Sequence, residues 1–193
     1  MSALPSCPIR LLLHGIDTIQ CAYYLQHRFN EDAKIDFAML SRQKESIRQS
    51  KKKDPLPVVL GNTEFLLHPY GSSSGYPLII SNSDFKIEMG EFNMPNFYVS
   101  FTSEGLWRES EYILHEKFLS WADSVGYEPM INETLSRVDF SFDYKLTEID
   151  FNEDWFVSYS KKDSKNRDSG IVQTFTFGRD DIVLRVYDKV AEI

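Results

Sequence analysis

The sequence predicts an α+β fold, a largely antiparallel β-sheet with helices packed on one face. Three observations predict it. Short segments in which apolar and polar residues alternate recur along the chain, as in half-buried strands. Two longer segments carry apolar residues at helical spacing. Clusters of Gly, Pro, Ser and Asn separate the short segments, which favours tight connections between antiparallel strands.

The elements follow in a definite order. We expect a strand at 16–25, a helix at 33–50, short strands at 58–60, 64–68, 78–81, 85–89 and 97–101, a helix at 104–125, and strands at 135–144, 172–177 and 183–189. Ser103 is the predicted N-cap of the long second helix and Gly126 its terminator. The polar stretch 161–170 is predicted to be a mobile loop. The helix face that should lie on the sheet carries Leu106, Leu114, Phe118, Trp121 and Val125.

Composition restricts the class of protein. The 193 residues suffice for one good-sized core or two small ones, and we expect residues 1–193 to form the N-terminal portion of a single, longer domain. Cys7 and Cys21 do not form a Cys-x-x-Cys pair, which argues against a disulfide scaffold or zinc ribbon and favours a reducing cytoplasm. The apolar run Ile9–Leu13 is too short to span a bilayer, so no membrane partner is expected.

Charge is unevenly distributed. The net charge of −8 argues against a protein that coats nucleic acid without specificity. Two segments are nevertheless basic: 42–53 holds six Lys and Arg residues against Glu45, and 161–167 holds four against Asp163. Each is either a solvated helix face or loop, or a surface for a DNA backbone.

Two strands carry residues suited to chemistry. In the strand around 136–144, Arg137, Asp139, Ser141 and Asp143 share one face, while Val138, Phe140, Phe142 and Tyr144 should face the core. Carboxylates on one strand face can bind a hard divalent cation, directly or through waters.

The last strand sets Arg185, Tyr187 and Lys189 on one face, opposite Leu184 and Val186. A phenol between two cations can act as a nucleophile toward a phosphodiester that the cations hold. The alternative is a salt-bridge ladder in which Arg185 and Lys189 pair with Asp139 and Asp143, and pattern alone favours it.

A family resemblance bears on this choice. The segments Ser136-Arg-Val-Asp-Phe-Ser-Phe-Asp143, Phe177-Gly-Arg179 and Leu184-Arg-Val-Tyr-Asp-Lys-Val-Ala-Glu192 together resemble the replication initiation factor family. That family comprises the trans-acting initiators of rolling-circle plasmids and related relaxases of mobile elements and filamentous phages. The resemblance covers residues 136–192 and implies a relaxase-like fold that continues beyond Ile193.

The resemblance implies a metal-dependent, site-specific DNA endonuclease and strand transferase of the bacterial cytoplasm. Tyr187 would be the nucleophile, Arg185 and Lys189 would contact the phosphate, and Asp139, Asp143 and Glu192 would bind Mg²⁺ or Mn²⁺. The implied partner is a replication or transfer origin, single-stranded or cruciform, and a host helicase and a second copy of the chain are further candidates. Among the other tyrosines, Tyr144 ranks second as nucleophile.

Two departures keep alternatives open. The paired-histidine motif of the other large relaxase class is absent, since His14, His27, His68 and His115 are scattered. Asp180 and Asp181 stand where the family has small polar residues, which fits a phosphate site only if they lie at a turn. A non-catalytic DNA-binding or regulatory relative is therefore the second hypothesis, and an unrelated α+β interaction module is the third.

Overall fold

The computed structural model describes residues 9–29, 35–146, 159–168, 170–179 and 181–188. The chain divides into two compact units. The larger unit is Leu11–Asp143, and the smaller combines Met1–Arg10 with Tyr144–Ile193.

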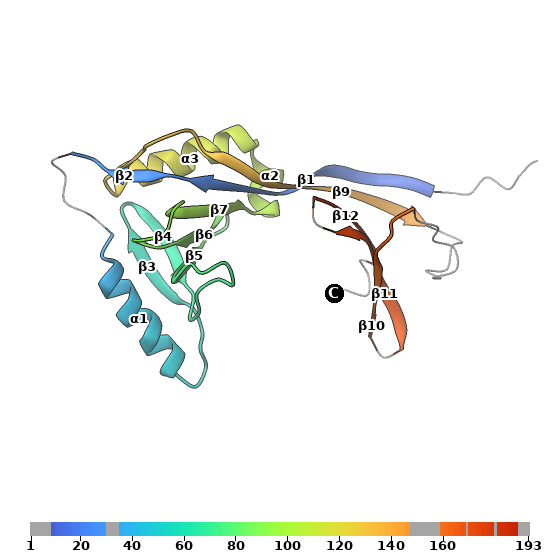
Figure 1. Ribbon diagram of the computed structural model, residues 1–193, viewed down its shortest axis with the longest axis horizontal. Helices are drawn as coiled ribbons and strands as arrows, with labels where there is room; N and C mark the ends of the chain where they lie inside the picture. The colour runs from blue at the N-terminus through green and yellow to red at the C-terminus, as the bar shows by residue number, and fades with distance from the viewer. Residues whose placement is uncertain (1–8, 30–34, 147–158, 169, 180, 189–193) are drawn as a thin grey trace, which may run out of the picture. The chain divides into compact units, whose positions relative to one another are not determined.

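A seven-stranded sheet runs through the larger unit (Figure 1). Its strand order is β3-β4-β5-β6-β7-β1-β9, and the pairings from β3 to β1 are antiparallel. The fold class predicted from sequence, α+β with a largely antiparallel sheet, is confirmed. The strands are β1 Ile9–Tyr23, β3 Leu56–Leu60, β4 Thr63–Leu67, β5 Leu78–Ser81, β6 Phe85–Met89, β7 Phe97–Phe101 and β9 Thr134–Leu146.

The structure extends one predicted strand and adds a small second sheet. β1 begins at Ile9, before the predicted start at residue 16, because the apolar run at its beginning continues the strand. A second, two-stranded sheet joins β2, Leu25–His27, to β8, Tyr127–Pro129. Each of these strands has three residues, too few for a period-two pattern to be seen in the sequence.

The predicted second helix is two helices. α2 spans Ser103–Arg108 and α3 spans Glu111–Ser124, with Glu109 extended between them. Thr102, rather than Ser103, caps α2 by accepting from the Gly105 amide (3.0 Å), and Ser110 caps α3. A second capping residue therefore starts a new helix where a continuous one was expected. Gly126 ends α3 with φ of +85°, as predicted.

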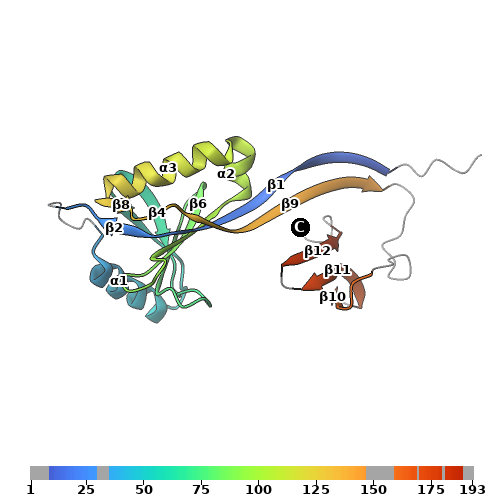
Figure 2. The same ribbon diagram turned by 45° about the horizontal axis from the view of Figure 1, so that its top comes forward.

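One hydrophobic core unites the sheet with the helices. α3 lies on the sheet (Figure 2). The Phe118 ring packs there against Tyr23, Phe85 and Phe97. The other predicted α3 side chains, Leu114, Trp121 and Val125, are buried, and Leu106 packs against the cluster. The first helix, α1, spans Phe37–Gln49 and contributes Leu40 and Ile47 to the same cluster. Among the described helices none has the length and apolar character that a membrane crossing requires.

The smaller unit is built on a three-stranded antiparallel sheet, β10-β11-β12. The strands are β10 Asp163–Asp168, β11 Ile171–Arg179 and β12 Ile182–Tyr187. The prediction of a mobile loop at 161–170 was wrong, because residues 163–168 form β10. This strand hydrogen-bonds to β11 although all of its side chains are exposed. A strand that buries no side chain has no apolar periodicity, so its sequence is indistinguishable from that of a polar loop.

Candidate active-site strands

Arg185 and Tyr187 lie on the same face of β12. In the β11–β12 register Thr176 pairs with Arg185 and Thr174 with Tyr187, so two threonines stand beside the cation and the phenol. Tyr187 is 41% exposed, and Arg185 is exposed as well. The face therefore presents a guanidinium, a phenol and two hydroxyls to solvent. The threonines were not predicted, although their alternation with Phe175 in the sequence indicates them.

The opposite face of the same two strands is apolar. Phe175, which is 1% exposed, pairs with Val186, and Phe177 pairs with Leu184. The Phe175 and Phe177 rings are stacked with their centroids 6.4 Å apart. Because successive side chains in a strand point to opposite faces, burial of Phe175 directs its neighbours Thr174 and Thr176 outward.

Gly178 shapes the turn that precedes β12. Its φ is +93°, and a Cβ atom there would lie 2.3 Å from the Ile182 carbonyl oxygen. The Gly178 amide donates to the Lys162 carbonyl and to the Ser160 hydroxyl, both at 3.0 Å. Asp181 is an exposed residue of the turn between β11 and β12, whereas Asp180 is outside the described residues.

On β9 the structure joins Arg137 to Asp139. Arg137 Nε donates to Asp139 Oδ1 at 2.7 Å and Nη2 to Oδ2 at 2.5 Å, a bidentate pair on one strand face. The hydrogen bond to Asp139 raises the pKa of Arg137. Ser141 and Asp143, which follow on the same face, are half-buried. The negative charge of Asp139, which was expected to bind a metal ion, is thus already balanced by the guanidinium of Arg137.

The other face of β9 is not core, contrary to the sequence prediction. Phe140, Phe142 and Tyr144 are 66%, 58% and 51% exposed. Val138 does pack against the core cluster, and Phe142 stacks on His14 with ring centroids 6.3 Å apart. Strand alternation predicts which side chains share a face, but it does not show whether another element covers that face.

The predicted metal ligands are not assembled in the described part of the chain. Asp139 and Asp143 are four residues apart, about 13 Å along an extended strand, so one ion cannot contact both directly. No group of three His, Cys, Asp or Glu side chains that could hold a metal occurs among the described residues. Glu192 and Lys189 lie outside these residues, so their roles remain predictions.

The salt-bridge ladder between β9 and β12 is not formed by strand pairing. β9 is the outer strand of the seven-stranded sheet, whereas β12 belongs to the three-stranded sheet. Cross-strand pairs require neighbouring strands of one sheet. In the larger unit Asp139 pairs instead with Arg137 of its own strand.

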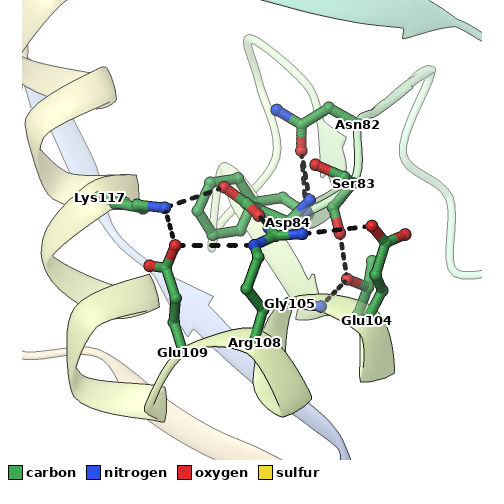
Figure 3. A network of polar contacts seen from close by, with 10 residues as sticks. Asn82, Ser83, Asp84, Glu104, Gly105, Arg108, Glu109 and Lys117 are labelled. Carbon is green, nitrogen blue, oxygen red and sulfur yellow. Dashed lines mark hydrogen bonds and ion pairs between the residues drawn. The ribbon is translucent and has the colours of Figure 1, made fainter.

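A dense charge cluster lies at the α2–α3 corner (Figure 3). Arg108 contacts Asp84, Glu104 at 3.2 Å and Glu109 at 3.7 Å, while Lys117 contacts Glu109 at 2.6 Å and Asp84 at 3.5 Å. A hydrogen bond from Lys117 lowers the pKa of Glu109 and, reciprocally, raises that of Lys117. Because both cations are met by carboxylates, the cluster joins the helix corner to the β5–β6 turn, and neither Arg108 nor Lys117 is left without an acidic partner.

Comparisons with known proteins give one structural likeness. No family model matches the chain, and no curated protein matches it in sequence. The solved structure of a rolling circle replication initiator protein from Geobacillus stearothermophilus is similar with a TM-score of 0.42 and 16% identity, over 93% of this chain and 68% of that one. A likeness of this degree does not define a function for this chain.

Proposed function

We propose that the chain is a DNA strand transferase that nicks an origin and initiates rolling-circle replication or transfer. The observation that carries the proposal is the exposed face of β12, on which Arg185 stands two residues from Tyr187. The motif segments at 136–143, 177–179 and 184–192 point to the same activity. A nucleophile of this kind must reach a DNA phosphate, and Tyr187 has the exposure that this requires.

The proposed reaction exchanges one phosphoester bond for another. The Tyr187 phenolic oxygen attacks the phosphorus, the bond from phosphorus to the 3′ oxygen breaks, and the phenolic proton passes to solvent. The leaving 3′ oxygen takes up a proton and becomes a free hydroxyl, while the 5′ phosphate stays on Tyr187. Arg185 would donate to the non-bridging oxygens, which gain negative charge during the attack. Lys189 would act in the same way from the next position on that face.

Asp139 is the proposed principal ligand of Mg²⁺ or Mn²⁺; Asp143, too distant to contact the same ion directly, would act through a bound water, and Glu192 would be a further carboxylate. Oxygen ligands suit these ions, which would supply polarisation of the phosphate. Arg137 donates one hydrogen bond to each oxygen of Asp139, so a metal ion would bind through the remaining lone pairs in competition with the guanidinium charge. Asp139→Asn should therefore lower activity most at limiting Mn²⁺, and excess Mn²⁺ should restore part of it.

An adduct-capture assay tests the proposal without a known origin. The chain is incubated with Mn²⁺ and a pool of randomised single-stranded oligonucleotides, and covalent complexes are separated on a denaturing gel. Wild-type protein should yield adducts, and Tyr187→Phe should lower their yield by at least about 10³-fold, the order expected when a covalent nucleophile is removed. Tyr159→Phe is the matched control, because Tyr159 is fully exposed in the same unit. Adducts that persist in Tyr187→Phe would assign the nucleophile elsewhere.

A non-catalytic DNA-binding relative is the second candidate, and the Arg137–Asp139 pair favours it. A carboxylate held by a guanidinium at 2.5–2.7 Å is stabilised without a metal ion. Under this alternative, calorimetric titration detects no Mn²⁺ binding to the wild type. The titration of Asp139→Asn then gives the same result as that of the wild type. Mn²⁺ binding that is lost in Asp139→Asn would exclude it.

A further inference from the structure

We infer that a basic corner at the end of α1, comprising Arg48, Lys51, Lys52, Lys53 and Tyr70, binds the phosphate backbone of DNA. The residues of this site are not those of the β12 face. The inference rests on the proposed function only in taking DNA as the polyanion that is bound. Arg48, Lys51, Lys52 and Lys53 are exposed; Glu45, which pairs with Arg48 at 3.2 Å, and Asp54 flank this basic run, so cations outnumber carboxylates four to two. In a chain of net charge −8, such a local concentration of cations is what a polyanion requires.

Three segments of the larger unit fix the geometry of the corner. Arg48 comes from the last turn of α1, Lys53 from the following turn, and Tyr70 from the β4–β5 connection. The Arg48 guanidinium and the Lys53 ammonium lie 5.9 and 5.8 Å from the centroid of the Tyr70 ring. The ring attracts both cations and so reduces the freedom that they lose when they meet a phosphate.

The turn after α1 is held by Ser50. Its hydroxyl donates to the Ile47 carbonyl (2.7 Å) and accepts from the Lys53 amide (3.0 Å). Lys53 adopts φ of +55°, which is uncommon for a residue other than glycine. The three lysines are therefore presented on a defined turn, not on a frayed helix end.

A groove of about 430 Å³ lies beside the corner and is lined by Gln43, Ser46, Ile47, Ser50, Lys51, Lys52, Asp54 and Leu56. Its two lysines outnumber its single carboxylate, so the lining carries a net positive charge that suits a phosphate.

An anionic membrane fits the corner less well. A helix that binds a bilayer surface turns an apolar face toward it. The apolar side chains Leu40 and Ile47 of α1 are 0% and 7% exposed because they belong to the protein core. Met39 is the one large apolar side chain of α1 that is exposed, at 39%, and a single residue does not form an apolar face.

The test is a binding measurement with a fluorescent 30-base-pair duplex of mixed sequence, in EDTA and over a range of salt. Lys51→Gln/Lys52→Gln should weaken binding at least tenfold and reduce the slope of log affinity against log salt by about 2. The matched control Lys161→Gln/Lys162→Gln makes the same change in net charge in the basic segment of the smaller unit, and should weaken binding less than twofold. Equal loss in both variants, or loss in the control alone, would overturn the inference.

Two further arms identify the ligand and the role of the ring. Tyr70→Leu keeps every charge but releases the two cations, so we expect a roughly two- to fivefold loss with an unchanged salt slope. Poly-glutamate should compete poorly with the duplex at equal charge concentration, and equal competition would overturn DNA as the ligand. Because binding is measured in EDTA, failure of the proposed nicking reaction leaves this result unaffected and appears separately as absence of adducts from the wild type.

Discussion

At the scale of single residues, a few positions determine how the polar faces are built. Phe175 is buried and Tyr187 is 41% exposed, and alternation along the paired strands β11 and β12 places these two side chains on opposite faces. Asp139 is held by Arg137, and Gly178 allows the turn that starts β12. The alternation of side chains along a strand predicted that Arg137 and Asp139 share one face of β9. It predicted in the same way that Arg185 and Tyr187 share one face of β12. It could not predict the Arg137–Asp139 ion pair, which depends on side-chain conformation.

Gly178 provides the first prediction. Gly178→Ala must place a Cβ atom against the Ile182 carbonyl oxygen at a positive φ, so we expect a loss of about 2–4 kcal/mol in the stability of the β11–β12 hairpin. Gly170→Ala is the matched control, because Gly170 has a φ of +86° but nothing within 4 Å of its Cβ position. Its cost should be about 1–2 kcal/mol, from backbone conformation alone. Amide hydrogen exchange of β12 measures the loss of stability in each variant. Equal losses in Gly178→Ala and Gly170→Ala would contradict the steric explanation.

Glu88 provides a pH-dependent prediction. Burial alone would raise its pKa, but hydrogen bonds from Lys86, Ser72 and Ser74 outweigh burial and lower it. Since the folded pKa lies below the unfolded one, its stabilising contribution is present above the ordinary carboxyl range and disappears as pH falls through the folded value. Glu88→Gln should therefore lower stability by about 1–3 kcal/mol at pH 7 and much less at acid pH. Denaturant unfolding at both pH values checks this, and a deficit independent of pH would contradict it.

At the scale of elements, sequence pattern succeeded where one face of an element is buried. The strands β5, β6 and β7 have the predicted bounds, because Phe85, Ile87 and Met89 alternate with polar residues and face the core. β10 was missed because none of its side chains is buried. The break between α2 and α3 was missed because Leu106 and Leu114 keep helical spacing across it, although Ser110 already signals a new N-terminus.

The capping residues of α2 allow a direct comparison. Thr102→Ala removes the acceptor of the Gly105 amide and should cost about 1 kcal/mol of stability. Ser103→Ala, at the position that the sequence pattern selected as the N-cap, should change stability by less than about 0.5 kcal/mol because Ser103 lies inside the helix. Thermal unfolding of both variants decides between the two assignments, and a larger loss for Ser103→Ala would favour the sequence-based one.

At the scale of the whole molecule, the two units differ in how they are stabilised. The larger unit contains a continuous core from α1 and α3 to β1 and β4–β7. In the described part of the smaller unit, Phe175 is the buried hydrophobic residue. Chain length allows one core or two, but the bounds of the division could not be predicted, because the polar strand β10 has no apolar periodicity that would assign it to a sheet.

This difference predicts unequal local stability. Amides of β6 and β7 should exchange with solvent at least about tenfold more slowly than those of β11 and β12, because opening the latter exposes little apolar surface. Hydrogen exchange followed by mass spectrometry resolves peptides from each sheet. Equal protection of both sheets would contradict the assignment of the stabilising core to the larger unit.

The central claim is that Tyr187 forms a covalent bond with DNA, and peptide mapping of captured adducts tests it most directly. Adducts formed with the oligonucleotide pool are digested with nuclease and protease, and the modified peptide is sequenced by mass spectrometry. We predict a nucleotide phosphate on the Tyr187 side chain. A nucleotide on Tyr144 or another residue, or no modified peptide from wild-type protein, would contradict the claim.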